Sequence, residues 1–174
     1  MRILVCAQEA PLGPVNGFRR QLQGLLSALR HDHSVYVVAL LAPDQAGAAT
    51  ELADAARDPG LRVVRPPRSW LGLGRPASAA DPRWGAPAIY RRAVEWLGPV
   101  VAVEAQRFAP DLVYVTGARL AGLWPWCGDS PRVIAPLDAA HLSLLAQAAA
   151  GGQSRPLLAA AARRVRRFEA VEYR

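Results

Sequence analysis

The sequence of 174 residues contains no lysine: all 21 of its Lys+Arg residues are arginine. This absence excludes a phosphate-binding loop of the G-x-x-x-x-G-K-[ST] type, which needs the lysine. Two cysteines are too few for a disulfide scaffold or a cysteine-based zinc site. No apolar run approaches the roughly 18 residues of a membrane span, and the strand-like start at residues 2–6 is too short for a signal peptide. The sequence therefore predicts a soluble, cytoplasmic domain without a metal centre.

The arginines give the chain a formal net charge of +7 and a pI near 10.6. Such a charge is common in proteins that bind nucleic acid. However, 34 residues are alanine, and arginine used without lysine beside so much alanine indicates GC-rich coding DNA. Two interpretations stay open, a solvated basic surface and a surface for anionic ligands or anionic membranes. We do not predict a nucleic-acid partner.

Short apolar runs alternate with helical patterns along the chain. Runs of the kind found in buried strands occupy residues 2–7, 35–42, 61–64, 111–115 and 132–135. Helical patterns occupy residues 18–29, 45–57, 88–108 and 118–124 and continue from about residue 156, with Gly98-Pro99 expected to kink or split the third helix. Strands that alternate with helices predict the α/β class, here a Rossmann-like, doubly wound parallel sheet in one domain.

The loop after the first strand is the best candidate for a binding site. In open α/β sheets, ligands lie beyond the carboxyl ends of the strands, and helix N-termini attract anions. Asn16 is expected to cap the first helix, Gly17 allows close approach of a phosphate, and Arg19 and Arg20 add positive charge. The spacing of Gly13 and Gly17 does not match the dinucleotide fingerprint G-x-G-x-x-G. A tight turn that merely contains glycine is the alternative.

Several segments together resemble family 4 glycosyltransferases. They are the opening residues 1–5, Glu9-Ala10-Pro11, residues 14–20, the "PDLVYV" strand at residues 110–115, and the arginine-rich final helix. The likeness covers nearly the whole chain through short, degenerate motifs. It implies the N-terminal, acceptor-binding half of a GT-B enzyme, which moves a sugar from a nucleotide diphosphate sugar to a glycan or glycolipid hydroxyl with retention. It implies no cofactor and no divalent metal.

The resemblance also assigns roles to individual residues. Gly17 matches a loop that approaches the donor phosphates, although Phe18 replaces the second glycine of that loop. Asp138 matches a His-Asp pair after the fifth strand, where Leu137 replaces the histidine. His141 would lie on the same helical face as Asp138 and could take the histidine's place in the cleft. The alternative is that Asp138 caps a helix and that His141 is a surface residue.

Other features bear on the acceptor and on the extent of the protein. Trp70, Trp84 and Trp124 lie near loops and are candidates for a sugar-stacking acceptor site, or else they anchor loops in the core. The basic back of the final helix could contact anionic lipid, or it could be a solvated face. That helix has no terminating signal, which predicts truncation before a donor-binding domain. A non-catalytic α/β binding or partner module is the alternative function.

Overall fold

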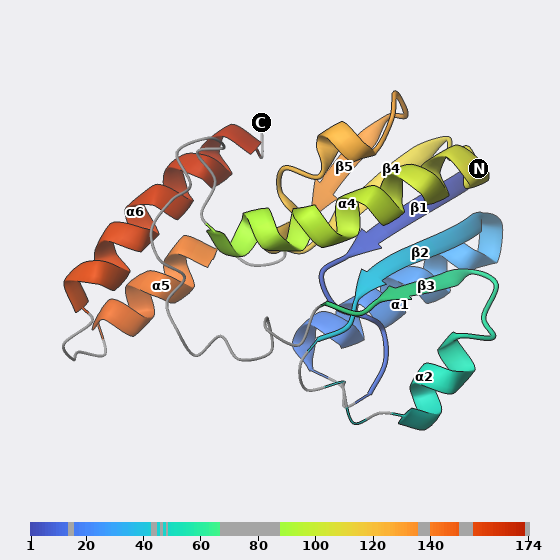
Figure 1. Ribbon diagram of the computed structural model, residues 1–174, viewed down its shortest axis with the longest axis horizontal. Helices are drawn as coiled ribbons and strands as arrows, with labels where there is room; N and C mark the ends of the chain where they lie inside the picture. The colour runs from blue at the N-terminus through green and yellow to red at the C-terminus, as the bar shows by residue number, and fades with distance from the viewer. Residues whose placement is uncertain are drawn as a thin grey trace.

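We analysed a computed structural model, which describes residues 1–13, 16–42, 45, 47, 49–66, 88–135, 140–149 and 155–172. Five parallel strands form one sheet in the order β3-β2-β1-β4-β5 (Figure 1). The strands are β1 (Arg2–Ala7), β2 (Ser34–Leu40), β3 (Leu61–Val64), β4 (Leu112–Thr116) and β5 (Arg132–Ala135). The predicted α/β, Rossmann-like sheet is confirmed.

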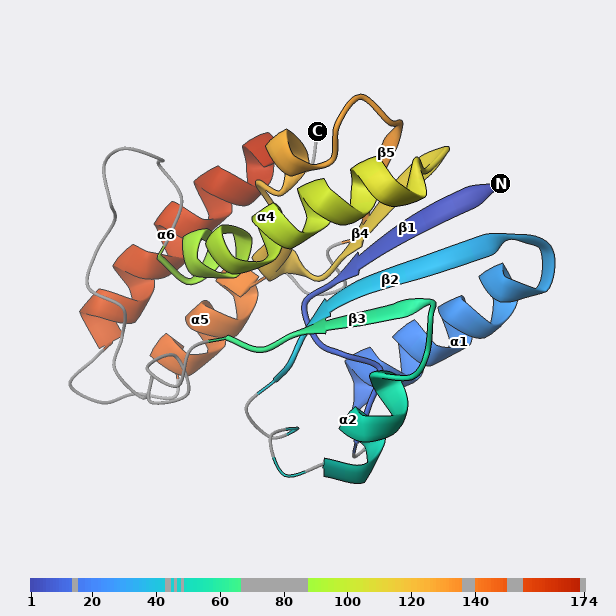
Figure 2. The same ribbon diagram turned by 45° about the vertical axis from the view of Figure 1, so that its right-hand side comes forward.

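Helices cover both faces of the sheet (Figures 1 and 2). The α-helices are α1 (Gly17–Asp32), α2 (Ala49–Ala55), α4 (Ala88–Phe108), α5 (Ala140–Ala149) and α6 (Arg155–Glu172). Two short 3-10 helices, η2 (Ala118–Leu120) and η3 (Trp124–Trp126), connect β4 to β5. No helix in the described part of the chain has the length and apolar character needed to cross a membrane.

The core consists of two layers because side chains alternate between the faces of a strand. On one face, Ile3 and Val5 of β1 pack with Leu22 and Leu26 of α1. On the other face, Leu4 and Cys6 of β1 pack with α4 and with the 3-10 segments. Every buried β1 residue from Ile3 to Ala7 is at most 3% exposed. β1 is therefore buried on both faces, as its continuous apolar run predicts.

α4 runs without interruption from Ala88 to Phe108 although it contains Pro99. A Cβ atom at Gly98 would lie 2.6 Å from the ring of Trp126, so the absence of a side chain makes room for that indole. The expected split at Gly98-Pro99 does not occur. The proline occupies an exposed position, while Leu97 and Val101 on the opposite side of the helix are completely buried. Packing of this apolar face stabilises the helix against the local cost of the proline.

α5 and α6 form a helical hairpin that packs mainly against itself. Ala148 of α5 and Ala162 and Val165 of α6 are buried, whereas the two helices make few contacts with the sheet. In both views the hairpin lies beyond the end of the sheet toward which the strand arrows point (Figures 1 and 2). The hairpin and the loop after β1 therefore belong to the same end of the molecule.

Candidate functional site at the carboxyl edge of the sheet

The order of the strands places a topological switch point between β1 and β4. The chain proceeds from β1 to β2 and β3 on one side, and then crosses to β4 and β5 on the other. Open parallel sheets bind their ligands at such a point, beyond the carboxyl ends of the strands. Here Gln8, the first residue after β1, meets the segment after β4, residues 117–119. The Gln8 N–H donates to the Thr116 carbonyl at 3.2 Å and joins the two segments.

The side chain of Gln8 lies directly over the backbone of Gly117. Gly117 has a positive φ of +101°, and a Cβ atom there would lie 2.4 Å from the Gln8 side chain. The Gln8 Oε1 atom also accepts a hydrogen bond of 3.2 Å from the Arg119 N–H. Gln8 is 9% exposed. It therefore fills the space between the ends of β1 and β4 and forms the floor of the site.

The loop after β1 is attached to the end of β2. The Ala10 N–H donates to the Leu40 carbonyl at 2.7 Å. The buried amide of Gln45 donates to the carbonyls of Ala10 and Leu12, both at 2.7 Å, and accepts from the Ala42 N–H at 2.8 Å. One side chain thus satisfies three backbone groups in two loops. The position of the loop relative to the sheet is consequently fixed.

A carboxylate organises the start of α1. Asn16 is the N-cap, as predicted: its Oδ1 accepts from the Arg19 N–H at 2.8 Å. The Asn16 Nδ2 donates to Glu9 Oε2 at 3.1 Å, and an Arg19 guanidinium nitrogen lies 3.2 Å from the same oxygen. The Arg19 side chain is only 1% exposed, against 19% for Glu9. The charge of Arg19 is therefore directed at Glu9, inside the protein.

The first turn of α1 is open to the outside. The first helical hydrogen bond joins the Arg20 N–H to the Asn16 carbonyl at 3.0 Å, so the N–H groups of Gly17 and Phe18 precede it. Gly17 is exposed, and a Cβ atom on it would have no neighbour within 4 Å. Arg20 is exposed in the same turn. This arrangement suits an anion, because the first amide N–H groups and the positive end of the helix dipole lie there and Arg20 adds a positive charge in the same turn.

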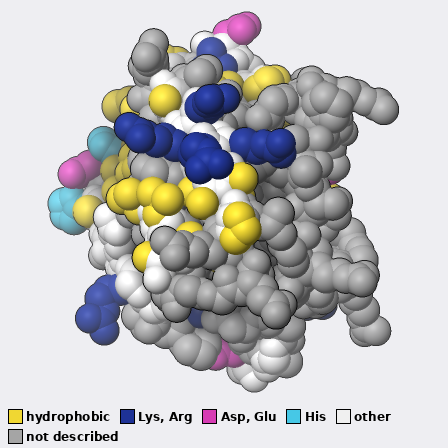
Figure 3. All heavy atoms as spheres, turned by 90° about the vertical axis from the view of Figure 1, so that its left-hand side faces the viewer, with side chains coloured by type: hydrophobic (Ala, Val, Ile, Leu, Met, Phe, Trp, Pro, Cys, Tyr) yellow, Lys and Arg dark blue, Asp and Glu magenta, His cyan; other side chains and the backbone are white. Residues whose placement is uncertain are grey.

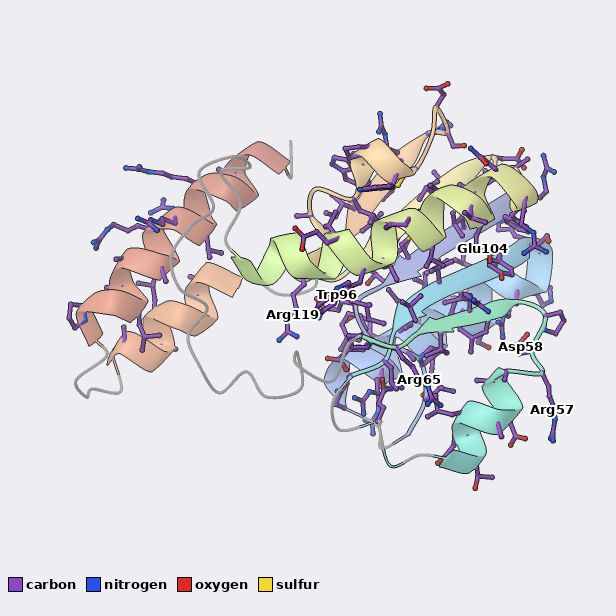
Figure 4. The ribbon with its side chains drawn as sticks, viewed as in Figure 1. Arg57, Asp58, Arg65, Trp96, Glu104 and Arg119 are labelled. Atoms are coloured by element: carbon purple, nitrogen blue, oxygen red, sulfur yellow. The ribbon has the colours of Figure 1, made fainter. Side chains whose placement is uncertain are left out.

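Two further arginines belong to this edge of the sheet. Arg65 follows β3 and is exposed, and Arg119 follows β4 and is partly exposed. In Figure 4 the Arg119 side chain extends away from the sheet, beyond the ends of the strands. Gln8, Gln45 and these two arginines were not among the residues predicted from the sequence. Gln8 and Arg65 directly follow the last residues of β1 and β3, and this position is the signal that could have found them. Gln45 and Arg119 lie a few residues beyond β2 and β4.

The other predicted site residues are distributed as follows. Trp124 lies in η3, is partly buried against the α4 side of the core, and has the Arg132 guanidinium carbon 5.8 Å from its ring centroid. His141 is the second residue of α5. Asp138, Trp70 and Trp84 lie outside the described residues. The pairing of Asp138 with His141 and the acceptor role of the tryptophans thus stay predictions.

A cavity of about 250 Å³ lies beside the site, between α1 and β4. It is lined by Gln21, Leu22, Leu25, Tyr114 and Thr116. On this face of the sheet, Val133 of β5 pairs with Tyr114 and is 45% exposed. On this face, beside α1, the part of the sheet formed by β4 and β5 is therefore left open by the described elements. The cavity begins one turn of α1 after Gly17, and its lining combines leucines with uncharged polar side chains.

The titratable groups with perturbed pKa values belong to the core on the α4 side of the sheet. Burial, and next the proximity of Glu104, raise the pKa of Tyr36; Glu104 lies between α4 and the sheet (Figure 4). Burial raises the pKa of Cys6, with a smaller effect of Cys127, and burial raises the pKa of Cys127 to about 11. Both cysteines are thiols at neutral pH. They act as packing residues rather than nucleophiles.

The fold and this edge define a class of protein: an α/β protein of Rossmann-like type with an open, anion-suited helix N-terminus at its switch point. Among the described residues, no group of three or more His, Cys, Asp or Glu side chains is arranged to hold a metal ion. No family model, no curated protein and no solved structure matches the chain significantly.

Proposed function

We propose that this chain is the acceptor-side domain of a retaining glycosyltransferase, which transfers a sugar from a nucleotide diphosphate sugar to a glycan or glycolipid hydroxyl. The observation that carries the proposal is the open first turn of α1 at the switch point, in a loop whose sequence resembles family 4 glycosyltransferases. A diphosphate is the part of such a donor that a helix N-terminus attracts.

In this proposal the N–H groups of Gly17 and Phe18 face the donor phosphates, and Arg20 contributes charge from the same turn. Arg19 acts indirectly, because its guanidinium holds Glu9, and Glu9 in turn binds the N-cap Asn16. Asp138 and His141 are the proposed cleft residues beside the reacting sugar. Trp70, Trp84 and Trp124 are the proposed acceptor contacts. The donor-binding domain would be a separate α/β unit of the same enzyme.

A pair of glycine substitutions tests this role of the loop. Gly17→Ala places a methyl group in open space, so the fold should be retained. The methyl group would stand between the backbone and a bound diphosphate and should lower kcat/KM for the donor by roughly 10- to 100-fold. Gly24→Ala is the matched control, because Gly24 lies exposed in the same helix and its added Cβ also meets no atom within 4 Å. It should leave kcat/KM unchanged.

The assay uses protein expressed from the complete reading frame that contains these residues. Release of nucleoside diphosphate is measured with a panel of nucleotide sugars and hydroxyl acceptors, and NMR of the product gives the anomeric configuration. We expect turnover with retention from one class of donor. No turnover with any donor, or equal activity of the Gly17 and Gly24 variants, would contradict the proposal.

One observation favours the alternative, a non-catalytic α/β binding module. The floor of the site between the ends of β1 and β4 is the uncharged amide of Gln8, which supplies neither a general acid nor a general base. A binding module would retain a ligand without converting it. Calorimetric titration of the same nucleotide sugars separates the two: saturable binding without product in the turnover assay supports the module.

A further inference from the structure

The end of the molecule formed by α5 and α6 carries a concentration of exposed positive charge. Arg163, Arg164, Arg166 and Arg167 of α6 are all exposed. The chain contains no acidic residue from position 139 through position 168. Some exposed arginines elsewhere lie near carboxylates: Arg30 lies 3.5 Å from Asp58, and Arg57 lies 3.4 Å from Asp54. The distinguishing feature of α6 is that four exposed arginines lie within five consecutive residues of one helix.

Apolar side chains are exposed next to this charge. Leu142 is 57% exposed and Leu145 is 44% exposed, although both belong to a helix whose Ala148 is buried. Residues three apart lie on one helical face, so the two leucines form a pair that the hairpin packing does not use. Figure 3 views the molecule from the hairpin end: arginine side chains form a row there, and hydrophobic side chains lie directly beside them.

We propose that this surface, made of Arg163, Arg164, Arg166, Arg167, Leu142 and Leu145, binds an anionic lipid bilayer. Guanidinium groups bind phosphate headgroups, and each basic side chain near an anionic leaflet adds to the attraction. The leucines enter the boundary between headgroups and acyl chains, as the apolar face of an interfacial helix does. Nucleic acid supplies the same phosphates but has no apolar layer for exposed leucines, so the combination favours a bilayer.

Docking would also orient the protein. The hairpin lies beyond the carboxyl ends of the strands, at the same end of the molecule as the loop after β1 (Figure 1). A bilayer bound to the hairpin would bring that loop toward the lipid headgroups, while the amino ends of the strands would point away from them. This inference does not depend on the proposed transferase activity, since it rests on a different surface.

Vesicle flotation tests the proposal with the whole chain. The probes are vesicles of phosphatidylcholine alone and of phosphatidylcholine mixed with phosphatidylglycerol, at about 0.1 M salt, where the Debye length is about 10 Å. The chain should float with the anionic vesicles and not with the zwitterionic ones. Replacing the four α6 arginines with glutamine should lower the partition coefficient by about fivefold per arginine. The double variant Leu142→Ser/Leu145→Ser should lower it by about tenfold per leucine.

A variant with equal loss of charge elsewhere serves as control. Arg2→Gln/Arg30→Gln/Arg57→Gln/Arg62→Gln removes four exposed guanidiniums outside the hairpin and should keep vesicle binding within a fewfold of the unmodified chain. Circular dichroism checks that each variant is folded. If the α6 variant unfolds, the test rests on vesicle binding by the leucine variant and on the salt dependence of vesicle binding by the unmodified chain.

Three outcomes would overturn the proposal: no binding of the unmodified chain to anionic vesicles, equal loss in the control variant, or no effect of the leucine pair. A mobility-shift assay with duplex and single-stranded DNA covers the other polyanion. Binding to DNA that depends on the α6 arginines, without binding to vesicles, would assign the surface to nucleic acid instead.

Discussion

At the scale of single residues, the contact between Gln8 and Gly117 fixes how the ends of β1 and β4 fit together at the switch point. They are far apart in sequence, yet the glycine has room only for hydrogen where the glutamine side chain lies. Gly128 also has a positive φ, of +65°, but a Cβ atom there would meet nothing within 4 Å. A comparison of substitutions at these two glycines therefore separates the free-energy cost of backbone strain from that of a steric clash.

Gly117→Ala should lower the free energy of unfolding by more than Gly128→Ala does. Strain alone costs roughly 1–3 kcal/mol at either position, and only Gly117→Ala also displaces the Gln8 side chain. Urea unfolding measures both variants. Adding Gln8→Ala to Gly117→Ala should recover part of the loss, because the clash is removed while the strain stays. Equal losses for the two glycines would show that Gln8 moves aside without cost.

Individual site residues were partly predictable. The N-cap role of Asn16 follows from its position before an apolar periodicity, and the structure confirms it. The burial of Arg19 did not follow, because the sequence places Glu9 ten residues earlier and gives no sign that the loop folds back onto the helix. Ion pairs across a loop depend on its path, which residue types alone do not determine.

At the scale of elements, Gln45 connects the loop after β1 with the segment after β2. Gln45→Ala removes the hydrogen-bond partner of two loop carbonyls and one loop N–H. This change should lower the free energy of unfolding by about 2–3 kcal/mol. Gln45→Glu should be at least as harmful, since a carboxylate cannot donate to the carbonyls of Ala10 and Leu12. Thermal unfolding measures both changes. Unaltered stability of Gln45→Ala would mean that the loop is positioned from elsewhere.

Three strands, residues 2–7, 61–64 and 132–135, have the predicted bounds, and the other two differ by one or two residues at their ends. Continuous apolar runs between turn residues identify buried strands well because both faces must be apolar. α5 was not among the helices predicted from apolar periodicity, because its alanine-rich sequence has little of it. The expected break at Pro99 failed because burial of the helix face outweighs the local preference.

At the scale of the whole molecule, the five-stranded body and the α5–α6 hairpin are two parts with few mutual contacts. A chain that ends after Ala135 should therefore fold and unfold cooperatively, with a melting temperature within a few degrees of the intact chain. Circular dichroism melting and hydrogen exchange of the β1 and β4 amides measure this. Loss of a cooperative transition would show that the hairpin is part of the folding core.

The outermost strands have a consequence for association between copies of the chain. β3 and β5 form the two edges of the sheet, and each has only four residues, with an exposed arginine, Arg62 or Arg132. Short, charged edges offer few backbone groups for pairing with a strand of another molecule. Both edge strands expose backbone N–H and C=O groups of the kind that pair when a sheet grows into a fibril. Their short length and their charge protect the fold against such growth.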